Sequence, residues 1–316
     1  MSKYTSIGGQ ALSEGIMMRG PKRTVMAVRT KEGEIDITEM SYTPIKEKYK
    51  ILGWPLIRGA VNLVESMIQG YKAIELSAEK SGFADEDEPQ QDGKESKPVA
   101  IGAVMIVAAV LAVFLSVGLF MYLPALAFDG IVLLAGEQIL PYAPIFEGLI
   151  RLIILIGYMF AVSLMKDIKR VFQYHGAEHK TIFCFENGKE LTVENVRPEK
   201  RFHPRCGTSF LVLMVLVSII VSAAIIVIFP SLRENTILWT SIKILLVPVI
   251  CGIGYELIKI CGRYDNLLTR IISAPGVWVQ RITTREPDDD MIEIAIAAMK
   301  EVIPQEVKEN EESDNL

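Results

Sequence analysis

The chain has 316 residues, and half of them are hydrophobic. This fraction is too high for an ordinary soluble protein of this length and is typical of a protein that crosses a membrane several times. The formal net charge is −5, and no basic patch interleaved with aromatic residues is present, which argues against nucleic-acid binding.

The cysteines and the start of the chain indicate the compartment. The four cysteines have no spacing typical of a disulfide framework, which favours a reducing, cytosol-facing environment. Residues 1–10 contain no apolar run, so we expect no cleavable signal peptide. The sequence therefore predicts a mainly α-helical, multi-span membrane protein, with about four transmembrane helices and a small α+β N-terminal cytosolic domain.

This N-terminal domain is expected over residues 1–82. Residues 25–29 and 34–38 alternate in polarity around Lys31-Glu32-Gly33, which predicts a β-hairpin. Residues 56–80 have helical periodicity with a broad apolar face. That helix is expected either to pack on the hairpin or to lie on the membrane surface.

The segment 6–20 is rich in glycine, which indicates tight turns or close backbone approach. Gln10, Glu14 and Arg19 are candidates to face a ligand or the histidine segment described below. The alternative is the compact start of a domain with glycines in its turns. A phosphate-binding loop is excluded, because no Gly-Lys-Ser/Thr follows.

The rest of the chain divides by hydropathy. An acidic, disordered linker is expected at 83–98, a first pair of transmembrane helices within 99–165 and a second pair within 209–258. The four predicted spans are 99–123, 145–165, 209–229 and 237–258, and a hairpin at 124–144 joins the first two. A C-terminal helical region is expected at 259–303 and a disordered tail at 304–316.

The distribution of Lys and Arg predicts the orientation of these spans. Residues 166–208 hold nine Lys or Arg, whereas 124–144 hold none and 230–236 hold only Arg233. Because positive residues accumulate on the cytoplasmic side, both termini and the segment 166–208 are expected in the cytoplasm. The predicted location is the bacterial cytoplasmic membrane, with the lipid bilayer as one partner.

All three histidines of the chain lie in this cytosolic segment. His175 and His179 are four residues apart, which places them one turn apart on one helix face, and Glu178 completes an H-x-x-E-H motif. His203 and Cys206 come just before the third span, so the chain returns to the same membrane face. His and Cys are the ligands that zinc prefers, so we expect a zinc site.

Two versions of this site differ in the fourth ligand position. If His175, His179, His203 and Cys206 all bind, the site is closed and structural. If three of them bind and a water takes the fourth position, Glu178 is the expected catalytic base. Glu256 is a further candidate, as an extra ligand or proton relay, although a solvated helix end explains it too. The alternative without metal makes the histidines polar residues at the membrane surface.

Long motifs of the chain resemble the DUF1385 family. They are GGQALSEGIMMRGP at 8–21, WPLIRGAVNLVESMIQGYKAI at 54–74, YHGAEHK at 174–180, HPRCGTSF at 203–210 and REPDDDMIEIAIAA at 285–298. The resemblance covers nearly the whole chain except the acidic linker and tail. The resemblance implies a multi-span membrane protein. Members of the family are sometimes labelled as metal-dependent enzymes, and that label rests on the same histidines.

Three functions are consistent with these patterns. The first is a zinc-dependent hydrolase at the cytosolic membrane surface, acting on a membrane protein or a lipid. The second is a non-enzymatic scaffold or membrane-protein biogenesis factor, in which a structural metal fixes a partner-binding platform. The third is a transporter, for which homo-oligomers would supply the additional spans.

Overall fold

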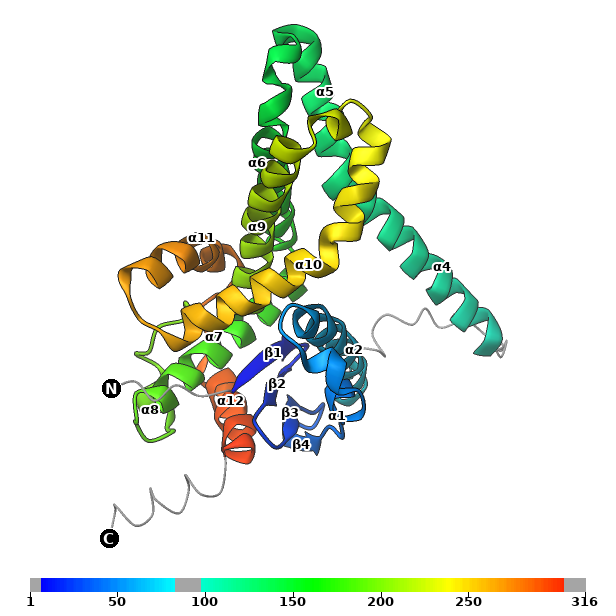
Figure 1. Ribbon diagram of the computed structural model, residues 1–316. Coiled ribbons are helices and arrows are strands. Elements are labelled where there is room, and N and C mark those ends of the chain that lie inside the picture. The colour runs from blue at the N-terminus through cyan, green and yellow to red at the C-terminus, as the bar shows by residue number, and fades with distance from the viewer. Residues whose placement is uncertain (1–6, 83–97, 304–316) are drawn as a thin grey trace.

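The computed structural model describes residues 7–82 and 98–303, and the side chains of 98–106 and 109 are excluded from the description. The protein is mostly helical, with a small N-terminal antiparallel sheet at one end and long apolar helices at the other (Figure 1). The predicted disordered tail (304–316) and all but Pro98 of the predicted linker lie outside the described residues.

Four strands form the sheet in the order β1-β2-β3-β4, all antiparallel. Their bounds are Gly8–Leu12, Gly15–Arg19, Thr24–Arg29 and Ile35–Glu39. The predicted hairpin is confirmed as β3–β4, whereas the first hairpin, β1–β2, was not predicted. Strands β2 and β3 are apolar at consecutive positions because both faces of the sheet are covered.

One face of the sheet packs on helix α2 (Ile57–Ser81), and the other packs on α7 (Lys166–Glu186) and α12 (Asp289–Val302). The helix predicted over 56–80 is therefore confirmed, and it packs on the sheet through Ala73 and Leu76. Its other side leaves large apolar residues exposed. They are Val64, Met67, Ile68, Tyr71 and Ile74.

Within residues 7–82 and 98–303, four helical segments are long and apolar enough to cross a membrane, in agreement with the predicted number. They are Val110–Ala135, Glu137–Val162, Gly207–Ile228 and Thr236–Arg263. The helices concerned are α4 (Pro98–Val117), η2 (Gly118–Tyr122, a π-helical turn), α5 (Leu123–Ala135), α6 (Ala143–Val162), α9 (Gly207–Ile228) and α10 (Thr236–Arg263).

The predicted hairpin at 124–144 is wrong over its first half. Residues 123–135 form helix α5, which continues the helical path of α4 and η2. The chain reverses only at Gly136, whose φ of +87° suits glycine. Asp129 of α5 pairs with Arg233.

Helices α6 and α7 are separate elements. The chain turns at 163–165, and α7 begins afresh after Met165, whose ψ is 139°. The turn lets α7 lie against the C-terminal segment, where the Arg285 N–H donates to the Phe172 carbonyl. Gly176 of α7 also approaches the Arg285 carbonyl too closely to admit a Cβ atom.

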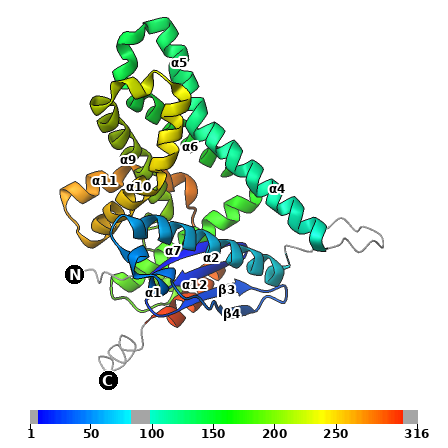
Figure 2. The same cartoon turned by 45° about the vertical axis from the view of Figure 1, so that its right-hand side comes forward.

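Helix α10 changes direction along its length, and Pro248 lies inside it (Figures 1 and 2). Its C-terminal half packs on α2 and on α11 (Leu267–Thr283). The remaining short elements are α1 (Ile45–Lys48), η1 (Lys50–Gly53), η3 (Glu137–Tyr142), α8 (Val193–Val196) and η4 (Pro230–Arg233).

Candidate metal centre

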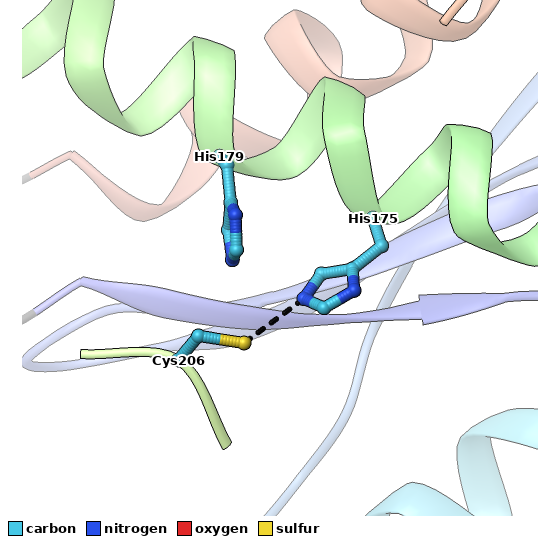
Figure 3. A group of neighbouring side chains, drawn as sticks. All are labelled: His175, His179 and Cys206. Carbon is cyan, nitrogen blue, oxygen red and sulfur yellow. Dashed lines mark hydrogen bonds between the residues drawn. The ribbon is translucent and has the colours of Figure 1, made fainter. Parts of the chain in front are cut away.

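His175, His179 and Cys206 converge between two helices (Figure 3). The histidines lie one turn apart on α7, and Cys206 is the residue that caps the start of α9. One ligand atom from each of the three lies within 4.8 Å of the others, and His175 Nε2 is 3.1 Å from Cys206 Sγ. This nitrogen and sulfur donor set is the one that zinc prefers.

The backbone fixes the orientation of both imidazole rings. His175 Nδ1 lies 2.8 Å from the Thr283 carbonyl oxygen, and His179 Nδ1 lies 2.5 Å from the Arg201 carbonyl oxygen. A carbonyl oxygen only accepts hydrogen bonds, so each Nδ1 carries a proton and Nε2 is the nitrogen left to bind a metal. This arrangement is typical of metal-binding histidines, whose second nitrogen donates to the protein.

Electrostatics within the group favour a thiolate. Burial raises the pKa of the Cys206 thiol, but the neighbouring His175 and His179 outweigh burial and bring it well below its ordinary value. Burial lowers the pKa of His175, yet the Cys206 sulfur raises it to about 9 overall. The N-terminus of α9 adds a favourable dipole at Cys206. Thiolate is the form of cysteine that binds metals.

Glu178 is buried beside the two histidines, and its environment is unusual for a carboxylate. Its side chain is 5% exposed, and Oε2 has no hydrogen-bond partner among the described residues. Burial raises the pKa of Glu178, while His179 and His175 oppose that rise. A buried carboxyl group with a raised pKa and a free oxygen is suited to accept a proton from a small molecule at the site.

Strand β1 closes the site from the side of the sheet. A Cβ atom on Gly9 would lie 2.7 Å from the Met17 carbonyl oxygen and 3.0 Å from Glu178 Cδ. The strand can therefore pass over Glu178 only because residue 9 has no side chain. The glycine-rich segment, whose role was open in the sequence, thus brings the N-terminal sheet against the histidine motif.

Gly9→Ala is expected to destabilise the protein by about 1–3 kcal/mol, because the added methyl group overpacks the strand against Glu178. Thermal unfolding of the purified full-length protein measures this effect. Gly8→Ala is the matched control, because a Cβ atom there meets nothing within 4 Å. Equal melting temperatures for the two variants would contradict this packing.

The structure does not bring His203 into the group of three. Its Nε2 lies 3.6 Å from Glu186 Oε2, and its ring centroid is 5.6 Å from that of His179. Gln280 holds the His203 backbone, accepting from its N–H and donating to its carbonyl, each at 2.6 Å. Burial lowers the pKa of His203 to about 4. His203 therefore lies beside the site, in the loop that delivers Cys206.

The other candidate residues lie in contacts of their own. Gln10 lies against Gly70 of α2, and Arg19 stacks on the Tyr42 ring. Glu14 accepts from Arg170 and from the Tyr174 hydroxyl, which fixes the β1–β2 turn on α7. Glu256 forms an ion pair with Arg58 at 2.5 Å, linking α10 to α2. None of the four belongs to the described metal-ligand group.

Several residues that build the site carry no motif in the sequence. The Thr283 and Arg201 carbonyls orient the histidines, and Gln280 holds the Cys206 loop. Backbone carbonyls are present at every position, so only the fold identifies those that matter. Gln280 follows no recognisable spacing from the histidines.

Comparison with known proteins identifies the family. The family model described as "Protein of unknown function (DUF1385)" matches residues 54–305, which include the three converging residues and Glu178. The chain is 33% identical over 314 residues to "Uncharacterized protein YqhQ" of Bacillus subtilis (strain 168), covering 96% of this chain and 95% of that one. No solved structure matches the present chain significantly. The chain therefore belongs to the DUF1385 family.

Proposed function

We propose that this protein is a zinc-dependent hydrolase at the cytosolic face of the bacterial cytoplasmic membrane. His175, His179 and Cys206 would hold the metal, leaving a fourth position for water or substrate. The observation that carries the proposal is the buried Glu178, whose carboxyl group interacts electrostatically with all three ligands and has one oxygen without a hydrogen-bond partner among the described residues. When bound, zinc supplies Lewis-acid polarisation of the scissile group. Glu178 would take a proton from the attacking water.

The proposed substrate is a membrane protein or a lipid. The four apolar helices support a placement in the bilayer, with the sheet, α7 and α12 on the cytosolic side. The exposed apolar side of α2 supports the same placement, because α2 packs on α10 and would lie flat on the membrane surface. A site held at the membrane surface is most accessible to molecules that are embedded in the membrane.

This topology predicts which positions a membrane-impermeant thiol reagent can reach in intact cells. Cysteine placed at the exposed Gln138 position is expected to react from outside, and cysteine at the exposed Lys189 position only after the cells are opened. The four native cysteines are buried and give little background. Labelling of the Lys189 position in intact cells would contradict the proposed orientation.

The hydrolase is tested by comparing the membrane lipids and membrane proteins of cells that lack this protein with those of rescued cells. Cells rescued with wild type are expected to clear a lipid or protein that accumulates without it. Cells rescued with Glu178→Gln are expected to accumulate the same molecule. Clearance by Glu178→Gln at the wild-type rate would exclude this mechanism.

The burial of the site favours one alternative, a structural metal that stabilises a partner-binding platform. Both His179 and Cys206 are buried, and β1 covers Glu178. In this alternative His203 would complete a closed four-ligand shell. Metal loss in His203→Gln, together with full rescue by Glu178→Gln, would favour the platform over the hydrolase.

A further inference from the structure

A cavity of about 360 Å³ lies among the long apolar helices, apart from the metal centre. It is bounded by α6, α9, α10 and the π-helical turn η2. Most of its lining is apolar, as with Leu155, Met214 and Ile250, but Arg151, Ser218 and Lys243 also reach it. Its volume falls within the roughly 300–1,000 Å³ of typical small-molecule sites.

A chain of buried ion pairs beside this cavity neutralises four charged side chains. Asp129 lies 2.6 Å from Arg233, Arg233 lies 3.4 Å from Glu147, and Glu147 lies 2.6 Å from Lys243. Two carboxylates therefore balance two cations. Glu147, Lys243 and Arg233 are almost completely buried, so the protein excludes water from these three groups, whereas the Asp129 side chain is 35% exposed.

Arg151 is the third cation beside the two carboxylates, and its hydrogen-bond partners among the described residues are neutral, although Glu147, one turn earlier on α6, attracts it at longer range. Its guanidinium donates to the Phe120 carbonyl at 2.7 Å and to the Ser218 hydroxyl at 2.8 Å. Phe120 belongs to the π-helical turn, a feature that often marks functional sites. A cation among apolar helices is costly unless an anion accompanies it.

The two ends of the cavity differ in polarity. Arg151, Ser218, Ser222 and Lys243 lie along one part of its wall, whereas Leu155, Met159 and Leu211 lie nearer the Cys206 end of α9. Leu211 and Ser222 are eleven residues apart on α9, which corresponds to about 16 Å. A site of this shape accommodates an extended apolar chain with a single charged group at one end.

We infer that this cavity binds a single-chain amphiphile whose anionic group, a carboxylate or a phosphate monoester, pairs with Arg151 and Ser218. The alkyl chain would extend along α9 past Met214 towards Leu211. The inference goes beyond the proposed hydrolase and needs only that the long helices lie in a bilayer. If this inference fails, the proposed hydrolase is unaffected. If the proposed hydrolase fails, this inference is unaffected.

Photolabelling of the full-length protein in phosphatidylcholine nanodiscs tests the inference. Three diazirine probes carry the same alkyl chain and differ only in the group at its end. They are a fatty acid, an alkyl phosphate and the methyl ester of the fatty acid. We expect the anionic probes to label cavity peptides about tenfold more strongly than the ester. The stronger of the two anionic probes distinguishes a carboxylate ligand from a phosphate ligand.

Variants at the cavity distinguish the effect of the Arg151 charge from the effect of the cavity volume. Arg151→Met is expected to remove the preference for anionic probes, and Arg151→Lys to retain it. Ser222→Trp, which fills the cavity, is expected to lower labelling by all three probes. Equal labelling by the ester and the anionic probes in wild type would overturn the inference. So would labelling confined to outward positions such as Ile153, which is 70% exposed.

Should Arg151→Met fail to fold, unlabelled dodecanoic acid and dodecyl phosphate serve as competitors against wild type. At least one of them is expected to suppress anionic labelling of the cavity peptides, with methyl dodecanoate as the inert control. No suppression by either anion would also overturn the inference.

Discussion

Glu178→Gln is expected to keep the metal and lose the activity. General acid–base catalysis contributes roughly 10²–10⁴-fold to a rate, and the amide cannot accept the proton. The three ligand atoms belong to other residues, so the zinc content should stay at the wild-type value. The measurement is clearance of the accumulated substrate in rescued cells, alongside zinc content of the purified variant.

The stability of this variant gives an independent check. Burial raises the pKa of Glu178, so the folded protein without metal bears the cost of holding a carboxylate there. A neutral amide of the same shape avoids that cost, so the thermal stability of metal-free protein should not fall. Glu190→Gln, on the exposed loop after α7, is the matched control and should rescue fully. Activity of Glu178→Gln equal to that of the control would contradict the assigned role.

Lys243→Met is expected to cause the largest loss of stability of any single change outside the metal centre. Lys243 and Glu147 are both buried and lie 2.6 Å apart. Removing one partner of a buried pair typically costs about 3–5 kcal/mol, and Glu147 would keep only its longer contact with Arg233 at 3.4 Å. Thermal unfolding in detergent, followed by tryptophan fluorescence, measures the change.

Two further variants test whether the loss of stability in Lys243→Met comes from the burial of the Glu147 charge. The double variant Lys243→Met with Glu147→Gln is expected to recover much of the stability, because no unpaired carboxylate remains. Arg270→Met breaks an ion pair with Asp265 whose side chains are 71% and 74% exposed, and should have little effect. A Lys243→Met melting temperature equal to that of Arg270→Met would show that the buried pair contributes little.

Sequence patterns with a strong local cause predicted most of the architecture. Apolar periodicity identified α2, and long apolar runs gave the correct number of long apolar helices. The i, i+4 spacing placed His175 and His179 together, because a helix determines that geometry regardless of the rest of the fold.

Features that depend on tertiary contacts could not be predicted in the same way. The first hairpin was missed because its glycines are needed for packing, with Gly9 against Glu178 and Gly15 against the Ala27 carbonyl. His203 and Cys206 are only three residues apart, so no sequence pattern separates them. Their separation follows from Gln280, which holds the His203 backbone while Cys206 turns into α9.

The zinc content of purified full-length protein shows whether His175, His179 and Cys206 form a metal site, with wild type measured beside His179→Ala, Cys206→Ala and His203→Gln. We expect one zinc per chain in wild type and in His203→Gln. We expect none in His179→Ala and a strongly reduced content in Cys206→Ala. Wild-type protein without metal, or full zinc content in His179→Ala, would contradict this metal site.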